Sequence, residues 1–144
     1  MHGRVSLLFL VVVSVTVFAV GCGSAGSARP ANIAAPEIRA GLAGTVFFGS
    51  GTSAPANIDV SVTNRATVPI VLRRLEVDSP GMGTYGLIRT TRTVRETIAP
   101  GETKNVTVFA TAVTTVRNPS EPLTIRVIAD FESGKDRWRE IELR

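Results

Sequence analysis

The chain has 144 residues, 16 of them basic and 12 acidic, with one histidine and one cysteine. The formal net charge of +4 is modest, which argues against nucleic-acid binding, because nucleic-acid binders usually gather more positive charge. The single histidine is His2 and the single cysteine is Cys22. Beyond residue 22 there is therefore no imidazole and no thiol, which excludes Ser-His-Asp and Cys-His catalysis and the common zinc sites. The composition predicts a non-enzymatic protein without catalytic residues, metal or cofactor.

The N-terminal stretch has the three parts of an export signal. Residues 1–4 are short and basic, residues 5–20 are apolar apart from two serines and a threonine, and residues 21–24 are small. This order is typical of a secretory signal peptide. The apolar run is shorter than the ~20 residues that a membrane-spanning helix needs. The pattern therefore predicts a signal peptide helix that is cleaved, over residues 1–21.

The end of this stretch carries a more specific motif. Ala19-Val20-Gly21-Cys22 resembles the lipobox of bacterial lipoproteins, with Ala19 where that family most often has leucine. The resemblance implies cleavage before Cys22, diacylglycerol on the Cys22 sulfur and, in most members, acylation of the new amino terminus. Two or three acyl chains are what a lasting membrane attachment requires. The alternative is an uncleaved anchor with an incidental cysteine.

The resemblance also implies a location. It predicts a protein of the cell envelope, held on the non-cytoplasmic side of a membrane by the lipid on Cys22. In bacteria with two membranes, the residue after the cysteine influences sorting, and Gly23 is not the aspartate associated with inner-membrane retention. In such a host the resemblance favours the outer membrane.

The remaining chain divides into a linker and one domain. Residues 22–43 are rich in Ala, Gly, Ser and Pro and show no sustained periodicity, which predicts a flexible linker. Within it, residues 35–40 form either a short turn or a first edge strand. Residues 44–144 have the size of a single domain.

This domain reads as a series of short strands. Ile58, Val60 and Val62 alternate with polar residues, the pattern of a half-buried strand. In residues 68–77 the inward parity changes at Arg73-Arg74, which predicts a bulge. Strands are also predicted at residues 46–48, 85–89, 91–98, 106–110, 124–131 and 136–143, with turns between them.

Seven or eight strands without intervening helices predict an all-β fold, an antiparallel immunoglobulin-like β-sandwich. Ile98-Ala99-Pro100-Gly101-Glu102 resembles the "apolar-x-Pro-Gly-Glu" corner of bacterial immunoglobulin-like and fibronectin-III-like domains. The segment 64–70 resembles the Asn-containing turn of those domains and of the type-2 late-embryogenesis (water-stress) proteins. The chain departs from the immunoglobulin pattern in lacking a cysteine pair between sheets and in having Trp138 on its last strand. The resemblance carries no catalytic residues.

Arginines form the first candidate binding group. Gathered on one sheet face, they would make an anion or lipid-headgroup patch; the alternative is a solvated face paired with Glu76 and Glu96. The candidates are Arg73, Arg74, Arg89, Arg92 and Arg95.

Trp138 is the second candidate. By parity it faces opposite Ile141 and Leu143, so it is either an exposed aromatic contact on an edge strand or packed inward by a bulge. A third group, the carboxylates of Asp130, Glu132 and Asp136, could hold calcium through oxygen ligands, but their spacing matches no strong loop motif and a polar hairpin is favoured.

These observations predict a lipid-anchored accessory module of the envelope that binds a protein partner through sheet edges or loops. Two alternatives stay open at this stage. One is a structural or stress-protective envelope domain, and the other is a carbohydrate- or anion-binding module that uses Trp138 or the arginines.

Overall fold

A computed structural model describes residues 27–81, 83–116 and 122–144. Within these ranges the regular elements are eight β-strands: β1 (Glu37–Leu42), β2 (Ser53–Thr63), β3 (Ile70–Asp78), β4 (Tyr85–Ile88), β5 (Thr90–Ile98), β6 (Thr103–Thr114), β7 (Arg126–Ser133) and β8 (Asp136–Leu143). The signal peptide and Cys22 lie outside the described residues. No helix in the described part of the chain is long and apolar enough to cross a membrane.

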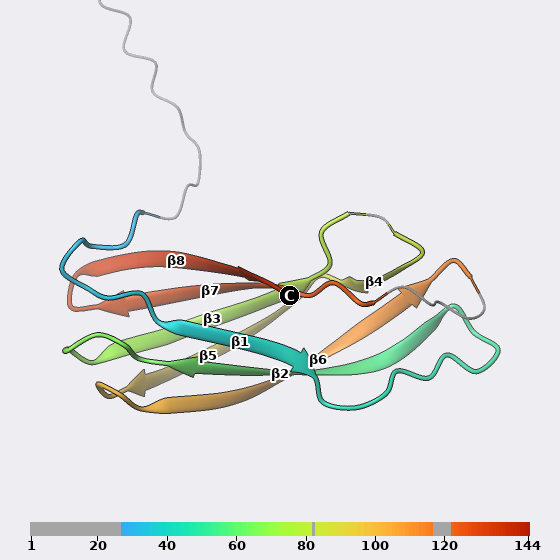
Figure 1. The fold of residues 1–144 in the computed structure, drawn as a ribbon, viewed down its shortest axis with the longest axis horizontal. Helices are drawn as coiled ribbons and strands as arrows, with labels where there is room; N and C mark the ends of the chain where they lie inside the picture. The colour runs from blue at the N-terminus through green and yellow to red at the C-terminus, as the bar shows by residue number, and fades with distance from the viewer. Residues whose placement is uncertain (1–26, 82, 117–121) are drawn as a thin grey trace, which may run out of the picture.

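The strands form two antiparallel sheets that pack face to face (Figure 1). The first sheet has the order β1-β2-β6-β4 and the second has the order β5-β3-β7-β8. The predicted fold class, an all-β antiparallel sandwich of seven or eight strands, is confirmed.

The core lies between the two sheets and follows from the alternation in the sequence. Ile58, Val60 and Val62 on β2 have no exposed surface, as their period-2 spacing predicts. Val127, Ala129 and Phe131 on β7 are buried equally completely in the opposing sheet. Burial of such apolar side chains supplies most of the stability of a domain that has no cross-link.

Strand pairing places the connections at two distinct ends of the sandwich. Three short connections, residues 64–69, 99–102 and 134–135, gather at one end, because Thr63 pairs with Thr103 and the β7–β8 turn lies beside the start of β3. We call this the turn end; it is at the left of Figure 1. The connections from β1 to β2, β3 to β4 and β6 to β7 lie at the opposite end, which we call the loop end.

The predicted bulge at Arg73-Arg74 is confirmed. The register of β3 against both β5 and β7 shifts between Leu72 and Arg74. Leu72 and Leu75 are both fully buried, so the two arginines between them both lie on the outer face of the sheet. A regular strand would have turned one of these arginines into the core.

Of the two alternatives for residues 35–40, the first edge strand is confirmed, because residues 37–42 form β1. The start of the domain at residue 44 and the strand at residues 46–48 are wrong. Ile33, before β1, is 5% exposed and belongs to the core. The sandwich therefore includes residues before residue 44. Residues 46–48 form no strand; Val46 and Phe48 pack partly buried against the core from a loop, and the Phe48 ring meets Tyr85 edge-on at 5.6 Å. Their apolar character serves loop packing rather than strand pairing.

Candidate functional site

Rows of arginines and carboxylates cross the outer face of the second sheet. Arg74 on β3, Asp130 on β7 and Arg139 on β8 occupy directly paired positions on the three adjacent strands. Arg74 donates to Asp130 at 2.8 Å and Arg139 donates to the same carboxylate at 2.7 Å. One carboxylate thus lies between two guanidinium groups.

A second row repeats this arrangement closer to the turn end. Arg73 donates to Glu132, and Arg137 donates to the same oxygen, Oε2, at 3.1 Å. Taken together, the two rows contain four arginines and two carboxylates, a net charge of +2. The pairs are partly exposed, so each contributes little to stability; the excess positive charge is the more informative property.

The arginines lower the pKa of the carboxylates of both rows. Burial acts to raise the pKa of Asp130, but the hydrogen bonds and charges of Arg139 and Arg74 outweigh it and hold that pKa below its ordinary value. The hydrogen bond from Arg73 likewise lowers the pKa of Glu132, with a further contribution from Arg137. The pKa of Arg139 is raised by Asp130. The rows are therefore fully charged at neutral pH.

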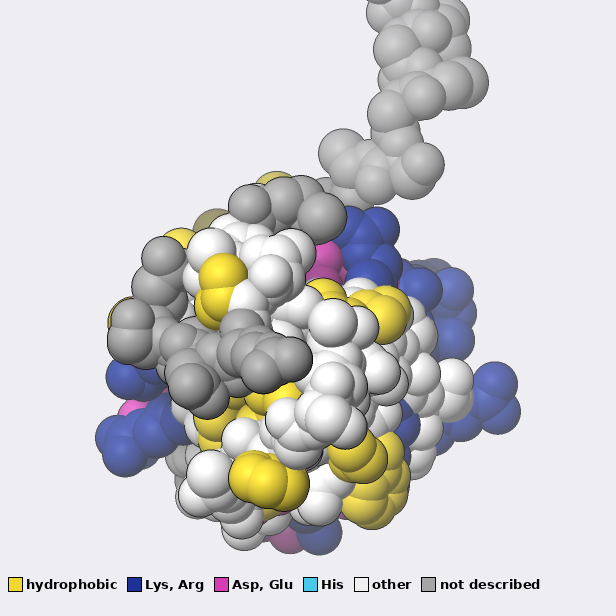
Figure 2. All heavy atoms as spheres, turned by 90° about the vertical axis from the view of Figure 1, so that its right-hand side faces the viewer, with side chains coloured by type: hydrophobic (Ala, Val, Ile, Leu, Met, Phe, Trp, Pro, Cys, Tyr) yellow, Lys and Arg dark blue, Asp and Glu magenta, His cyan; other side chains and the backbone are white. Residues whose placement is uncertain are grey.

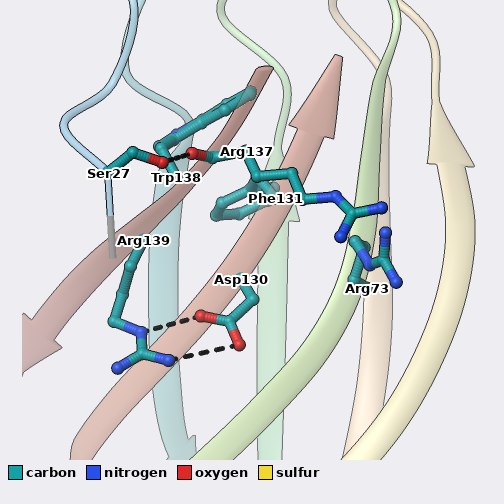
Figure 3. Close-up of a pocket in the computed structure, with 7 residues that line it drawn as sticks. All are labelled: Ser27, Arg73, Asp130, Phe131, Arg137, Trp138 and Arg139. Carbon is teal, nitrogen blue, oxygen red and sulfur yellow. Dashed lines mark hydrogen bonds and ion pairs between the residues drawn. The ribbon is translucent and has the colours of Figure 1, made fainter. Parts of the chain in front are cut away.

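These side chains surround a depression of about 230 Å³ in the surface. We call it the arginine hollow (Figure 3); its lining residues are Ser27, Arg73, Asp130, Phe131, Arg137, Trp138 and Arg139. In Figure 3 the guanidinium groups of Arg73 and Arg137 lie close to one another while that of Arg139 lies against Asp130. Ser27, which donates to the backbone carbonyl of Arg137, closes one side.

Two of the four predicted binding residues, Arg73 and Trp138, line this hollow. Trp138 is 2% exposed and stacks on Phe131, with ring centroids 5.6 Å apart and planes 22° apart. The β7–β8 register is regular through this pair, so the indole packs inward without a bulge. Of the two alternatives for Trp138, inward packing is confirmed and the exposed contact is wrong; the other face of β8 carries the exposed Ile141 and Leu143.

The indole has one further property. Its Nε1 is buried and has no hydrogen-bond partner among the described residues. A buried donor of this kind lowers stability.

The remaining arginine candidates do not join a single patch. Arg74 reaches the hollow indirectly, through Asp130. Arg92 on β5 donates instead to the carbonyl of Thr107 on β6. Arg89 pairs with Glu76 and Asp78, each at 3.2 Å, at the loop end. Of the expected partners, Glu76 therefore pairs with Arg89, whereas Arg73 and Arg74 use carboxylates on β7.

The carboxylates considered for calcium have other roles. Asp130 and Glu132 each pair with two arginines, and Asp136 is exposed in the β7–β8 turn. Within the described ranges, no three potential metal-ligating side chains gather. Positive charges, rather than additional oxygen ligands, thus surround the acids.

Sequence reasoning missed Arg137 and Arg139, which complete the hollow. A signal was present, because a two-residue turn at Gly134-Lys135 pairs position 132 with 137 and position 130 with 139. The alternation Arg137-Trp138-Arg139 then places both arginines opposite the two acids of β7. Sequence alone did not fix the turn length, and the register depends on it.

Comparison with known proteins gives only distant likenesses. No family model matches the chain, and no curated protein sequence matches it. Among solved structures, a protein from Archaeoglobus fulgidus is 16% identical with a TM-score of 0.46, covering 75% of this chain and 90% of that chain. A FixG-related protein from Vibrio parahaemolyticus is 9% identical with a TM-score of 0.35, covering 75% of this chain and 93% of that chain. Likeness at this level carries no argument about function.

Proposed function

We propose that the protein is a lipid-anchored, non-enzymatic module of the cell envelope, which holds its loop end away from the membrane for a protein partner. One observation carries the proposal: the first described residue of the chain and the exposed apolar loops lie at opposite ends of the sandwich. The chain enters the described structure at Ser27, which is bonded to Arg137 beside the β7–β8 turn. The entry point thus lies toward the turn end.

Chain length limits how far this entry point can lie from the lipid. Cys22 precedes Ser27 by five residues, and an extended chain spans at most about 3.6 Å per residue. A lipid on Cys22 would therefore keep Ser27 within about 18 Å of the modified cysteine. The 12-residue strand β6 separates the two ends by about 40 Å at the usual rise per residue. The loop end would then face away from the bilayer.

The loop end has the surface that a partner would use. Phe47 in the β1–β2 connection is 83% exposed, and Val116 after β6 is 40% exposed. The same end has a depression of about 120 Å³, lined in part by Leu87, Val113 and several glycines. Figure 2 views this end and shows hydrophobic side chains interspersed over it, with basic side chains at its margins. Exposed apolar surface with a polar surround is typical of protein interaction sites.

The side-chain inventory supports a binding role over catalysis. The described residues contain neither histidine nor cysteine, so the usual nucleophile–base pairs have no members there. The best-formed charged group, the two rows that form and flank the arginine hollow, contains acids that are already neutralised by arginines.

Site-specific photo-crosslinking in native membranes tests the proposal. A crosslinking amino acid at position 47 or 116 should capture one and the same protein, and capture should require Cys22. Position 109 is the matched control, since Phe109 is 72% exposed in the middle of β6, on the outer face of the first sheet and away from the loop end. Equal capture from position 109, or no capture from the loop end of an acylated chain, would contradict the proposed role.

Mass spectrometry of the mature chain tests the anchor separately. A chain that begins at Cys22 and carries diacylglycerol is the expected result. An intact leader with an unmodified sulfur would reject the anchor without affecting the crosslinking result.

A further inference from the structure

The arginine hollow is positively charged and incompletely paired. Arg137 donates to Glu132 through Nε alone, which leaves its two Nη nitrogens without a protein acceptor in the part of the chain that the structure describes. The Arg137 side chain is 67% exposed, whereas that of Glu132 is 28% exposed. The free N–H donors of Arg137 are therefore accessible to solvent, while the carboxylate oxygens of Glu132 are largely occupied.

This combination suits a phosphate group. Guanidinium groups bind phosphate oxygens through paired N–H donors, more strongly than neutral donors do. The hollow has about 230 Å³, room for a phosphate and several waters at about 30 Å³ per water. The two rows of side chains that form and flank the hollow, with four arginines, keep a net charge of +2 after Asp130 and Glu132 are counted.

The position of the hollow indicates where such a phosphate would come from. Ser27 forms part of its wall, and the proposed lipid attachment at Cys22 is five residues away. An anchored chain would therefore hold the hollow near the plane of the lipid headgroups, where phosphates are concentrated.

We infer that the arginine hollow binds the phosphate of an anionic phospholipid headgroup and so fixes the orientation of the sandwich on the membrane. The inference rests on the proposed lipid anchor for its choice of ligand. Binding at the hollow would bring the half of the β7–β8 hairpin nearer the turn end to the bilayer and keep the loop end exposed. The anchor alone would leave the domain free to rotate about its tether.

Vesicle co-sedimentation without the acyl chains tests this contact independently of the anchor. A chain of residues 22–144 with Cys22→Ser retains every described strand and Ser27. We expect it to bind vesicles of phosphatidylcholine with phosphatidylglycerol at least about tenfold more tightly than vesicles of phosphatidylcholine alone. Added salt should weaken this binding.

Paired variants test whether the hollow is responsible. Arg137→Gln with Arg139→Gln should abolish the preference for phosphatidylglycerol, while Arg137→Lys with Arg139→Lys should retain part of it. Arg39→Gln with Arg144→Gln removes the same charge from exposed arginines outside the hollow and should leave the preference unchanged. Circular dichroism checks that each variant is folded.

Inorganic phosphate distinguishes a headgroup from a free ion as the ligand. At constant ionic strength, millimolar phosphate should compete only weakly with vesicles. Any of three results would overturn the inference. These are strong competition by free phosphate, equal binding to both vesicle types, and an equal loss of the phosphatidylglycerol preference in the two double Arg→Gln variants. None of these results would affect the mass of the acylated mature chain, so the anchor and the headgroup contact can fail separately.

Discussion

The side-chain amide of Asn64 donates a 2.9 Å hydrogen bond to the carbonyl oxygen of Ile98, which lies 34 positions later in the chain. The same amide nitrogen donates to the carbonyl of Val68, and Oδ1 accepts from the backbone N–H of Ala66. The Asn64 backbone also bonds to the 99–102 turn at both its N–H and its carbonyl. One buried side chain therefore joins the β2–β3 connection to the β5–β6 turn.

Replacing Asn64 should be costly. Asn64 is 0% exposed, so Asn64→Ala removes three hydrogen bonds and leaves buried backbone groups without partners. We expect the free energy of unfolding to fall by about 3 kcal/mol. Denaturant titration measures this, with Asn105→Ala as a control on the exposed face of β6. Equal effects of the two substitutions would show that the Asn64 contacts do not hold the turns.

The pairing of Asp78 with Arg126 predicts a dependence of stability on pH. Asp78 is 5% exposed and bonds both Nε and Nη2 of Arg126, at 2.7 and 2.6 Å. The hydrogen bonds from Arg126, assisted by Arg89, lower the pKa of Asp78 below its ordinary value of 3.8, although burial acts to raise it. Because the folded-state pKa is the lower one, this contribution is present above pH 3.8 and is lost as the pH falls through the lowered value.

Asp78→Asn should therefore destabilise the protein by about 2 kcal/mol at pH 7. The difference from the unsubstituted chain should shrink as the pH falls below about 3.8, because protonation then removes the same charge. Urea unfolding at a series of pH values measures both effects. Asp136→Asn, in the exposed turn, is the control and should change stability little at any pH. A difference for Asp78→Asn that persists unchanged into acid would refute the assignment.

Gly101 permits the turn between β5 and β6. Its φ of 76° lies in the left-handed region, and a Cβ there would meet no atom within 4 Å. Gly101→Ala should thus cost about 1 kcal/mol through backbone conformation alone. Gly44→Ala has equally open space and no positive φ, so it should be neutral or slightly stabilising. Thermal unfolding of the two variants compares them, and equal melting temperatures would count against a conformational cause.

Trp138 gives a direct optical check of the core. Because its side chain is 2% exposed and stacked on Phe131, its fluorescence should be blue-shifted relative to the unfolded chain and poorly quenched by iodide. Trp138→Ala should reduce the free energy of unfolding by about 3–5 kcal/mol. The chain has no other tryptophan, so the signal needs no deconvolution. Strong iodide quenching in the folded protein would place the ring at the surface instead.

Sequence reasoning succeeded where burial imposes a strict period. The alternation through Ile58, Val60 and Val62 and the parity change at Arg73-Arg74 both predict features that the structure confirms. The sequence leaves β1 open between a turn and an edge strand because an edge strand buries little: within Glu37–Leu42 only Ile38 is buried. Apolar composition gave a false strand at residues 46–48, where the side chains pack from a loop.

The candidate site was only partly predictable for a different reason. Arg73 and Arg74 are predicted as members of a group of arginines on one sheet face, but their partners lie 59 and 56 positions away on β7. Which strands become neighbours is decided by packing of the whole sandwich, and no local pattern encodes it. Once the β7–β8 register is known, Arg137 and Arg139 follow directly.

The contacts of Ser27 and Arg29 have a consequence for solubility. β8 is an outer strand of its sheet, and outer strands offer unpaired backbone groups that template fibrillar self-assembly. The segment before β1 occupies part of that border, through Ser27 on the Arg137 carbonyl and Arg29 on Glu140 at 2.7 Å. A proteolytic cut that released this segment would expose the outer edge of β8. The shortened protein should therefore precipitate at concentrations at which the longer chain stays in solution.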